Sequence, residues 1–86
     1  MISKATARER AASLLDALLM GQTDDDRVAA DLVDLETCTD NAVLSACHKA
    51  RHFIADRDIH ARDPAYAREQ RSLLGEMIRD LRARVL

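Results

Sequence analysis

The chain has 86 residues, of which 48% are hydrophobic and 33% are charged, and its formal net charge at pH 7 is −2. This length fits one domain, and the hydrophobic fraction is large enough to build a core. Aromatic residues make up only 2% of the chain, with two glycines and one proline. Few residues suit the turn of a β-hairpin, and the composition therefore favours an all-α fold. We expect a single helical-bundle domain over residues 1–86.

Charge is distributed unevenly along the chain. Residues 21–40 carry seven acidic and one basic side chain, whereas residues 61–86 carry six basic and four acidic ones. A nucleic-acid binder usually concentrates its basic residues on one surface, so this balance argues against a nucleic-acid partner. The chain has no run of about 20 apolar residues that would span a membrane. Its charged start, MISKATARERAAS, lacks the apolar centre of a secretory signal. Two cysteines without an export signal then favour reduced thiols and a cytoplasmic location.

The first predicted helix begins at Ser3 or Thr6 and ends at Met20. Ser3 is a good N-cap, and Thr6 and Glu9 have the spacing of a capping box. Gly21 suits the left-handed position that follows many helices. The expected inner face consists of Ala7, Ala11, Leu14, Leu15, Leu18 and Leu19.

The second helix is predicted from Asp25 to Cys38 and the third from Asn41 to Asp58. The apolar stripe of the second helix is Val28, Leu32 and Leu35, and that of the third is Val43, Leu44, Cys47, Ala50 and Ile54. We expect Ile59, in the following connection, to turn inward. Cys47 falls on a buried face and is predicted to act as a small core residue, whereas Cys38 falls opposite the stripe of its helix.

The last predicted helix is the best specified. Asp63 is a good N-cap and Pro64 a good first residue. The apolar face that follows is Ala67, Gln70, Leu74, Met77, Ile78, Leu81 and Val85. This helix is about 30 Å long, against about 20 Å for the second helix. We therefore expect its end, at Leu81 and Val85, to contact a second copy of the chain or another protein.

Short connections favour antiparallel neighbours. The expected architecture is an up-down array of four helices, that is, two antiparallel helical hairpins with a long C-terminal helix. A domain of this size buries a modest fraction of its surface, so we also expect self-association as a homodimer or other homo-oligomer.

Two charged surfaces are predicted to bind another protein. One is the outer flank of the last helix, and the other is the acidic side of the second helix. Their residues are Arg68, Arg71, Arg79 and Arg82 on the former, and Asp31, Asp34 and Glu36 on the latter. Arginine is enriched at protein interfaces, although a solvated charged face is the alternative interpretation.

A column of His48, His52 and Asp56 lies on the outer side of the third predicted helix, because these residues are spaced four apart. Two histidines at this spacing can share a Zn²⁺ ion, with Asp56 as a third ligand. An ordinary solvated face is the competing interpretation.

The chain contains no glycine-rich phosphate loop, no nucleophile motif and no pair of carboxylates in an apolar setting. We therefore expect no enzyme, no resident cofactor and no small-molecule substrate. The sequence favours a small protein-protein interaction module, such as a regulator, inhibitor or adaptor. The alternative is a metal-binding or metal-sensing helical bundle.

Overall fold

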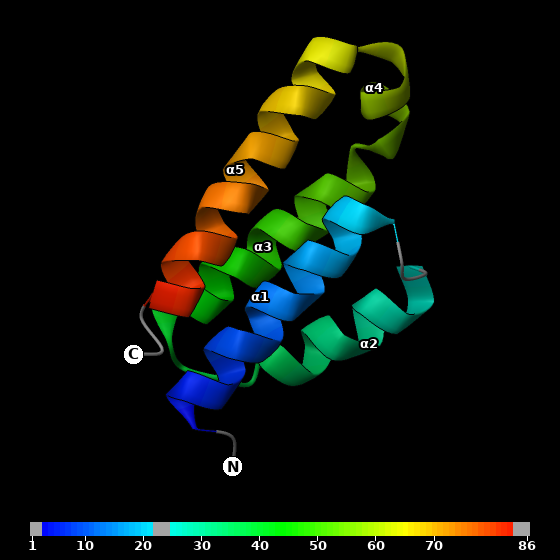
Figure 1. The fold of residues 1–86 in the computed structure, drawn as a ribbon. Coiled ribbons are helices and arrows are strands. Elements are labelled where there is room, and N and C mark those ends of the chain that lie inside the picture. The colour runs from blue at the N-terminus through cyan, green and yellow to red at the C-terminus, as the bar shows by residue number, and fades with distance from the viewer. Residues whose placement is uncertain (1–2, 22–24, 84–86) are drawn as a thin grey trace.

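The computed structural model describes residues 3–21 and 25–83. Within these ranges the chain is helical and has no strand, which confirms the all-α prediction. Its elements, in chain order, are α1 (Lys4–Met20), α2 (Asp25–Leu35), α3 (Asn41–Ala55), α4 (Arg57–Arg62) and α5 (Pro64–Ala83), as Figure 1 shows. The described part thus has five helices where four were predicted. None of them combines the length and apolarity needed to cross a bilayer.

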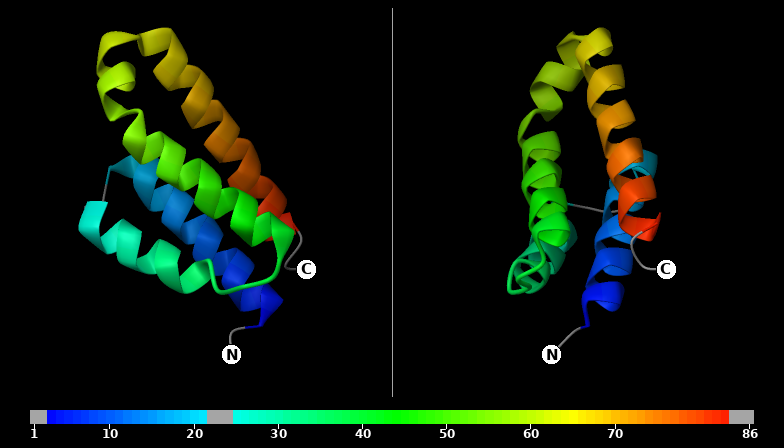
Figure 2. Two further views of the ribbon diagram at one scale, coloured as in Figure 1. Left: turned by 180° about the vertical axis from the view of Figure 1, so that it is seen from behind. Right: turned by 90° about the vertical axis from the view of Figure 1, so that its left-hand side faces the viewer.

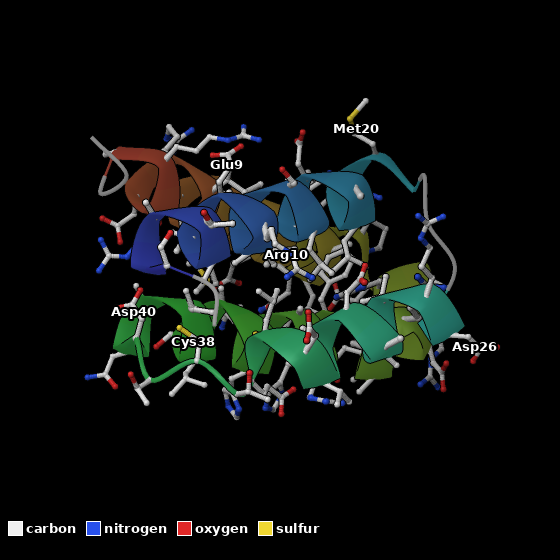
Figure 3. The ribbon with its side chains drawn as sticks, turned by 90° about the horizontal axis from the view of Figure 1, so that it is seen from below. Glu9, Arg10, Met20, Asp26, Cys38 and Asp40 are labelled. Atoms are coloured by element: carbon white, nitrogen blue, oxygen red, sulfur yellow. The ribbon has the colours of Figure 1, made fainter. Side chains whose placement is uncertain are left out.

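The helices form two layers (Figures 2 and 3). α1 lies beside α5 in one layer, and α2 lies beside α3 in the other. α1 packs against α2, α3 and α5, and α3 packs against each of the other four helices. In the described part of the chain α2 contacts α1 and α3 but not α5, so α2 and α5 occupy opposite corners of the array.

The helix ends follow from local chemistry. The Ser3 hydroxyl accepts a hydrogen bond from the Thr6 N–H at 3.2 Å, so the cap is at Ser3 and the helix starts at the earlier of the two predicted positions. Gly21 ends α1 with a left-handed φ of 65°. At the start of α5, Asp63 Oδ1 accepts a hydrogen bond from the Tyr66 N–H at 3.1 Å, as predicted for an N-cap.

Small aliphatic side chains from four helices build the core. The predicted inner faces are largely buried, and their partly buried members are Leu19, Leu44, Ile54, Ala67, Gln70 and Met77. Leu81 is 2% exposed inside this core. The prediction that Leu81 contacts a second copy is therefore wrong, and Val85 lies outside the described residues. The extra length of α5 lies at its beginning, where α4 packs against it.

Two helices end earlier than predicted. α2 ends at Leu35 rather than Cys38, because the Cys38 N–H bonds back to the Leu35 carbonyl at 3.0 Å in a tighter turn. α3 ends at Ala55 rather than Asp58 because Asp56, with φ −92° and ψ 13°, leaves the helical conformation before α4 begins. Ile59 on α4 is 41% exposed and does not turn inward as predicted.

Candidate functional site

The outer side of α5 carries three exposed arginines, Arg68, Arg71 and Arg79. Within residues 3–21 and 25–83, none of the three makes a hydrogen bond or an ion pair. Gly75 lies between them, and a Cβ atom built there would meet no other atom within 4 Å. We call Arg68, Arg71 and Arg79 the arginine face. Arg82, which the sequence grouped with them, instead lies 3.5 Å from the Glu9 carboxylate of α1.

Three arginines of α1 and α3 form ion pairs. The shortest contacts join Arg8 to Asp40 at 2.6 Å, Arg10 to Asp34 at 2.9 Å, and Arg51 to Glu36 at 2.6 Å. The arginines of α1 and α3 thus have carboxylate partners, whereas the arginine face of α5 has none in the described structure. The guanidinium groups of that face are free to bind an external anion.

The same pairs change the predicted acidic surface on α2. Asp34 and Glu36 are each neutralised by an arginine of a neighbouring helix. Asp31 remains unpaired among the described residues, but it is partly buried at the groove between α1 and α2. Of these three predicted acids, Asp31 alone is therefore unpaired among the described residues, and they do not form a continuous acidic stripe.

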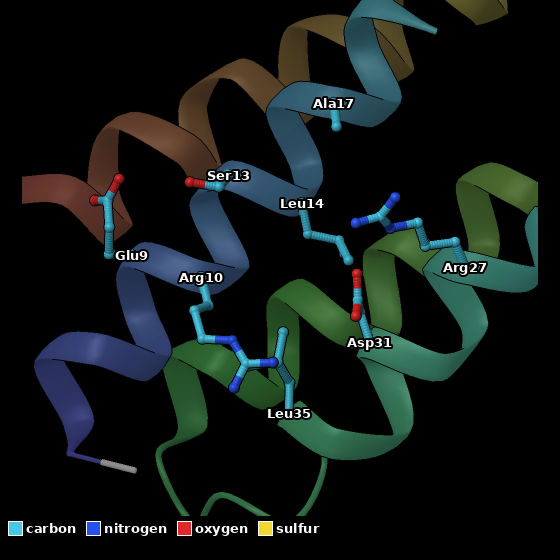
Figure 4. A pocket seen from close by; sticks show the side chains of 8 residues that line it. All are labelled: Glu9, Arg10, Ser13, Leu14, Ala17, Arg27, Asp31 and Leu35. Carbon is cyan, nitrogen blue, oxygen red and sulfur yellow. The ribbon is translucent and has the colours of Figure 1, made fainter. Parts of the chain in front are cut away.

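This α1/α2 groove has a volume of about 450 Å³ and is shown in Figure 4. Its apolar floor comes from Leu14, Ala17 and Leu35. Ser13 and four charged residues of both signs form its rim, namely Glu9, Arg10, Arg27 and Asp31. Because the rim mixes acids and bases, the groove does not select one ligand chemistry.

A partly buried ion pair between Arg8 and Asp40 was not predicted from the sequence. Asp40 is 7% exposed, and its carboxylate accepts bonds from Arg8 Nε at 2.6 Å and Nη2 at 3.0 Å. These hydrogen bonds raise the pKa of the Arg8 guanidinium. Asp40 occupies the N-cap position of α3, yet its side chain makes no capping bond. It links α1 to the start of α3, and neither residue carried a sequence signal for this pairing.

The histidine column on α3 is only partly assembled. The His48 and His52 rings lie with their centroids 4.5 Å apart, and both side chains are exposed. Asp56 accepts a hydrogen bond from the Tyr66 hydroxyl at 2.7 Å, which raises the pKa of Tyr66. No group of three or more histidine, cysteine, aspartate or glutamate side chains in the described ranges is placed to hold a metal ion. The predicted three-ligand site is thus reduced to a pair of histidines.

Helix α4 is anchored by an aromatic stack. The His60 ring lies 4.7 Å from the Phe53 ring of α3 and 5.5 Å from the Tyr66 ring of α5. His60 Nε2 is buried and has no hydrogen-bond partner among the described residues. Sequence reasoning assigned the anchoring role to Ile59 because it treated residues 59–62 as a loop, whereas in a helix the neighbouring His60 reaches the interior.

Both cysteines are free thiols. Cys47 is 2% exposed, and burial raises the pKa of its thiol to about 11. The low exposure agrees with the prediction that it acts as a small core residue. Cys38 is partly buried and packs against the edge of the core.

No protein-family model, curated protein or solved structure matches the chain. Its function is therefore inferred from the arrangement of its side chains.

Proposed function

We propose that the protein acts by binding another protein through the arginine face of α5. The observation that supports this proposal is the contrast between Arg68, Arg71 and Arg79, which lack partners in the described structure, and the paired arginines of α1 and α3. A planar guanidinium can donate two parallel hydrogen bonds to a carboxylate, so each unpaired arginine offers a specific docking point. The role is that of a regulator, inhibitor or adaptor without a catalytic centre.

The partner that best fits this face is an acidic segment of a different protein. Glu69 and Glu76 lie along the flank of the arginines on the same helix, and they would repel the continuous negative charge of a nucleic-acid backbone. Gly75 exposes the α5 backbone, so a protein segment can approach closely there. Two copies joined through the same face would place like charges opposite each other, which is unfavourable.

We also propose a cytosolic location for this interaction. Cys38 and Cys47 are both unbridged, and thiols persist in the reducing cytosol.

The test is capture of a partner from an extract of the native host by the immobilised protein. An Arg71→Glu/Arg79→Glu double variant is compared with Lys49→Glu, because Lys49 is a cation of α3 that also lacks a partner in the described structure. Losing two charge-assisted contacts costs about 3 kcal/mol, or roughly 100-fold in affinity. We expect the wild type and Lys49→Glu to retain the same partner and the double variant to lose it. Retention by all three, or a partner that disappears on nuclease treatment, would contradict the proposal.

A further inference from the structure

We infer that His48 and His52 form an open, two-histidine site for a transition-metal ion such as Zn²⁺, Cu²⁺ or Ni²⁺. The two residues are one helical turn apart on α3, so their side chains lie on the same face. Both rings are exposed, and their centroids are 4.5 Å apart. Two imidazole nitrogens that share a Zn²⁺ ion each lie about 2.0–2.1 Å from it. Rotation of the two side chains is enough to bring ring nitrogens to that geometry, because neither ring is held by packing in the core.

The donor set selects the kind of metal. Asp56, the carboxylate next in the column, is hydrogen-bonded to Tyr66 at 2.7 Å. The remaining donors are imidazoles, which suit Zn²⁺, Cu²⁺ and Ni²⁺, whereas Ca²⁺ and Mg²⁺ prefer oxygen ligands. Lys49 next to His48 adds positive charge. Binding must therefore come from nitrogen coordination rather than from a negative local field.

The site is open because two protein ligands are fewer than the four of a closed structural zinc site. Water or a donor group of another molecule must complete the coordination. His48 also lines a shallow hollow of about 500 Å³ between α3 and α5, together with Leu44, Ser45, Lys49 and Met77. A ligand that occupies this hollow lies beside His48 and is in position to supply a further donor. This site lies on α3 and involves none of the residues of the arginine face. Its test is therefore independent of the test of the proposed function.

Isothermal titration of Zn²⁺ and Cu²⁺ into the protein tests the inference. All variants carry Cys38→Ser, so that the partly buried thiol does not contribute to the heat. We expect one ion per chain in the otherwise wild-type protein and an affinity at least about tenfold lower in His48→Gln and in His52→Gln, since each removes a direct ligand.

Asp56→Asn is the matched control. It removes the carboxylate that the sequence suggested as a third ligand but leaves both imidazoles in place, so we expect it to bind the metal as tightly as the parent. Equal affinities in the parent, His48→Gln and His52→Gln would overturn the site. An Asp56→Asn variant as weak as the histidine variants would overturn the two-histidine assignment in favour of a three-ligand site. Thermal melts with and without metal supply a second measurement, because an ion that binds only the folded protein raises its melting temperature.

Discussion

Replacing Gly75 with alanine is expected to stabilise the protein. Gly75 lies inside the 20-residue helix α5, and an added Cβ atom would meet nothing within 4 Å. Glycine in a helix interior costs about 1 kcal/mol relative to alanine, since it loses more backbone freedom on folding. No steric clash offsets the gain here. The free energy of unfolding should therefore rise by about 0.5–1 kcal/mol.

The matched control is Gly21→Ala, which adds the same methyl group in equally open space. Gly21 has a left-handed φ of 65°, where a residue with a Cβ atom is disfavoured by roughly 1–2 kcal/mol. In thermal denaturation, a change of 1 kcal/mol in the free energy of unfolding shifts the melting temperature by about 4–8 °C in a domain of this size. Gly75→Ala should shift the melting temperature up and Gly21→Ala should shift it down, with an unchanged urea m-value. Shifts of the same sign would refute the argument, because the two sites would then differ in something other than backbone conformation.

Two further predictions concern buried groups. Burial raises the pKa of the Cys47 thiol from 9.0 to about 11, so the unfolded chain releases this proton at a lower pH than the folded protein does. The free energy of unfolding should fall as the pH rises from about 9 to about 11, and denaturation curves of Cys47→Ala should show a smaller fall; an equal fall would exclude this thiol as the cause. Asp40→Asn should lower the melting temperature more than Asp34→Asn, because Asp40 pairs with Arg8 in a partly buried site whereas the Asp34 pair with Arg10 is exposed. Equal shifts for the two variants would show that burial adds nothing to the Arg8 pair.

The features that could be predicted from the sequence are those that depend on neighbouring residues. Ser3 and Asp63 each cap a helix by bonding to the backbone three residues ahead. Gly21 ends α1 because only glycine adopts its backbone conformation at little cost. The core positions followed from helical periodicity, which depends on a single repeated spacing along the chain.

The features that were missed depend on contacts between distant residues. Arg10 and Asp34 are 24 residues apart in the chain, and Arg51 and Glu36 are 15 apart. Counting charges therefore indicated an acidic α2, whereas these contacts neutralise two of its acids. The separate helix α4 depends likewise on the stack of His60 with rings from α3 and α5. The spacing of Phe53, His60 and Tyr66 along the chain does not reveal that their rings meet, so it does not show that the connection is helical rather than a loop.

The position of α5 also limits how the chain can associate with itself. α2 and α5 lie at opposite corners of the array and do not touch within the described residues. A contact between Asp31 on α2 of one copy and the arginine face of another is therefore head-to-tail, and each added copy presents the same two surfaces again. Such contacts form rings or open chains rather than a closed two-fold dimer. Growth of the molar mass with concentration would point to head-to-tail association through the arginine face. A constant mass together with loss of a captured acidic protein in Arg71→Glu/Arg79→Glu would assign that face to a different partner.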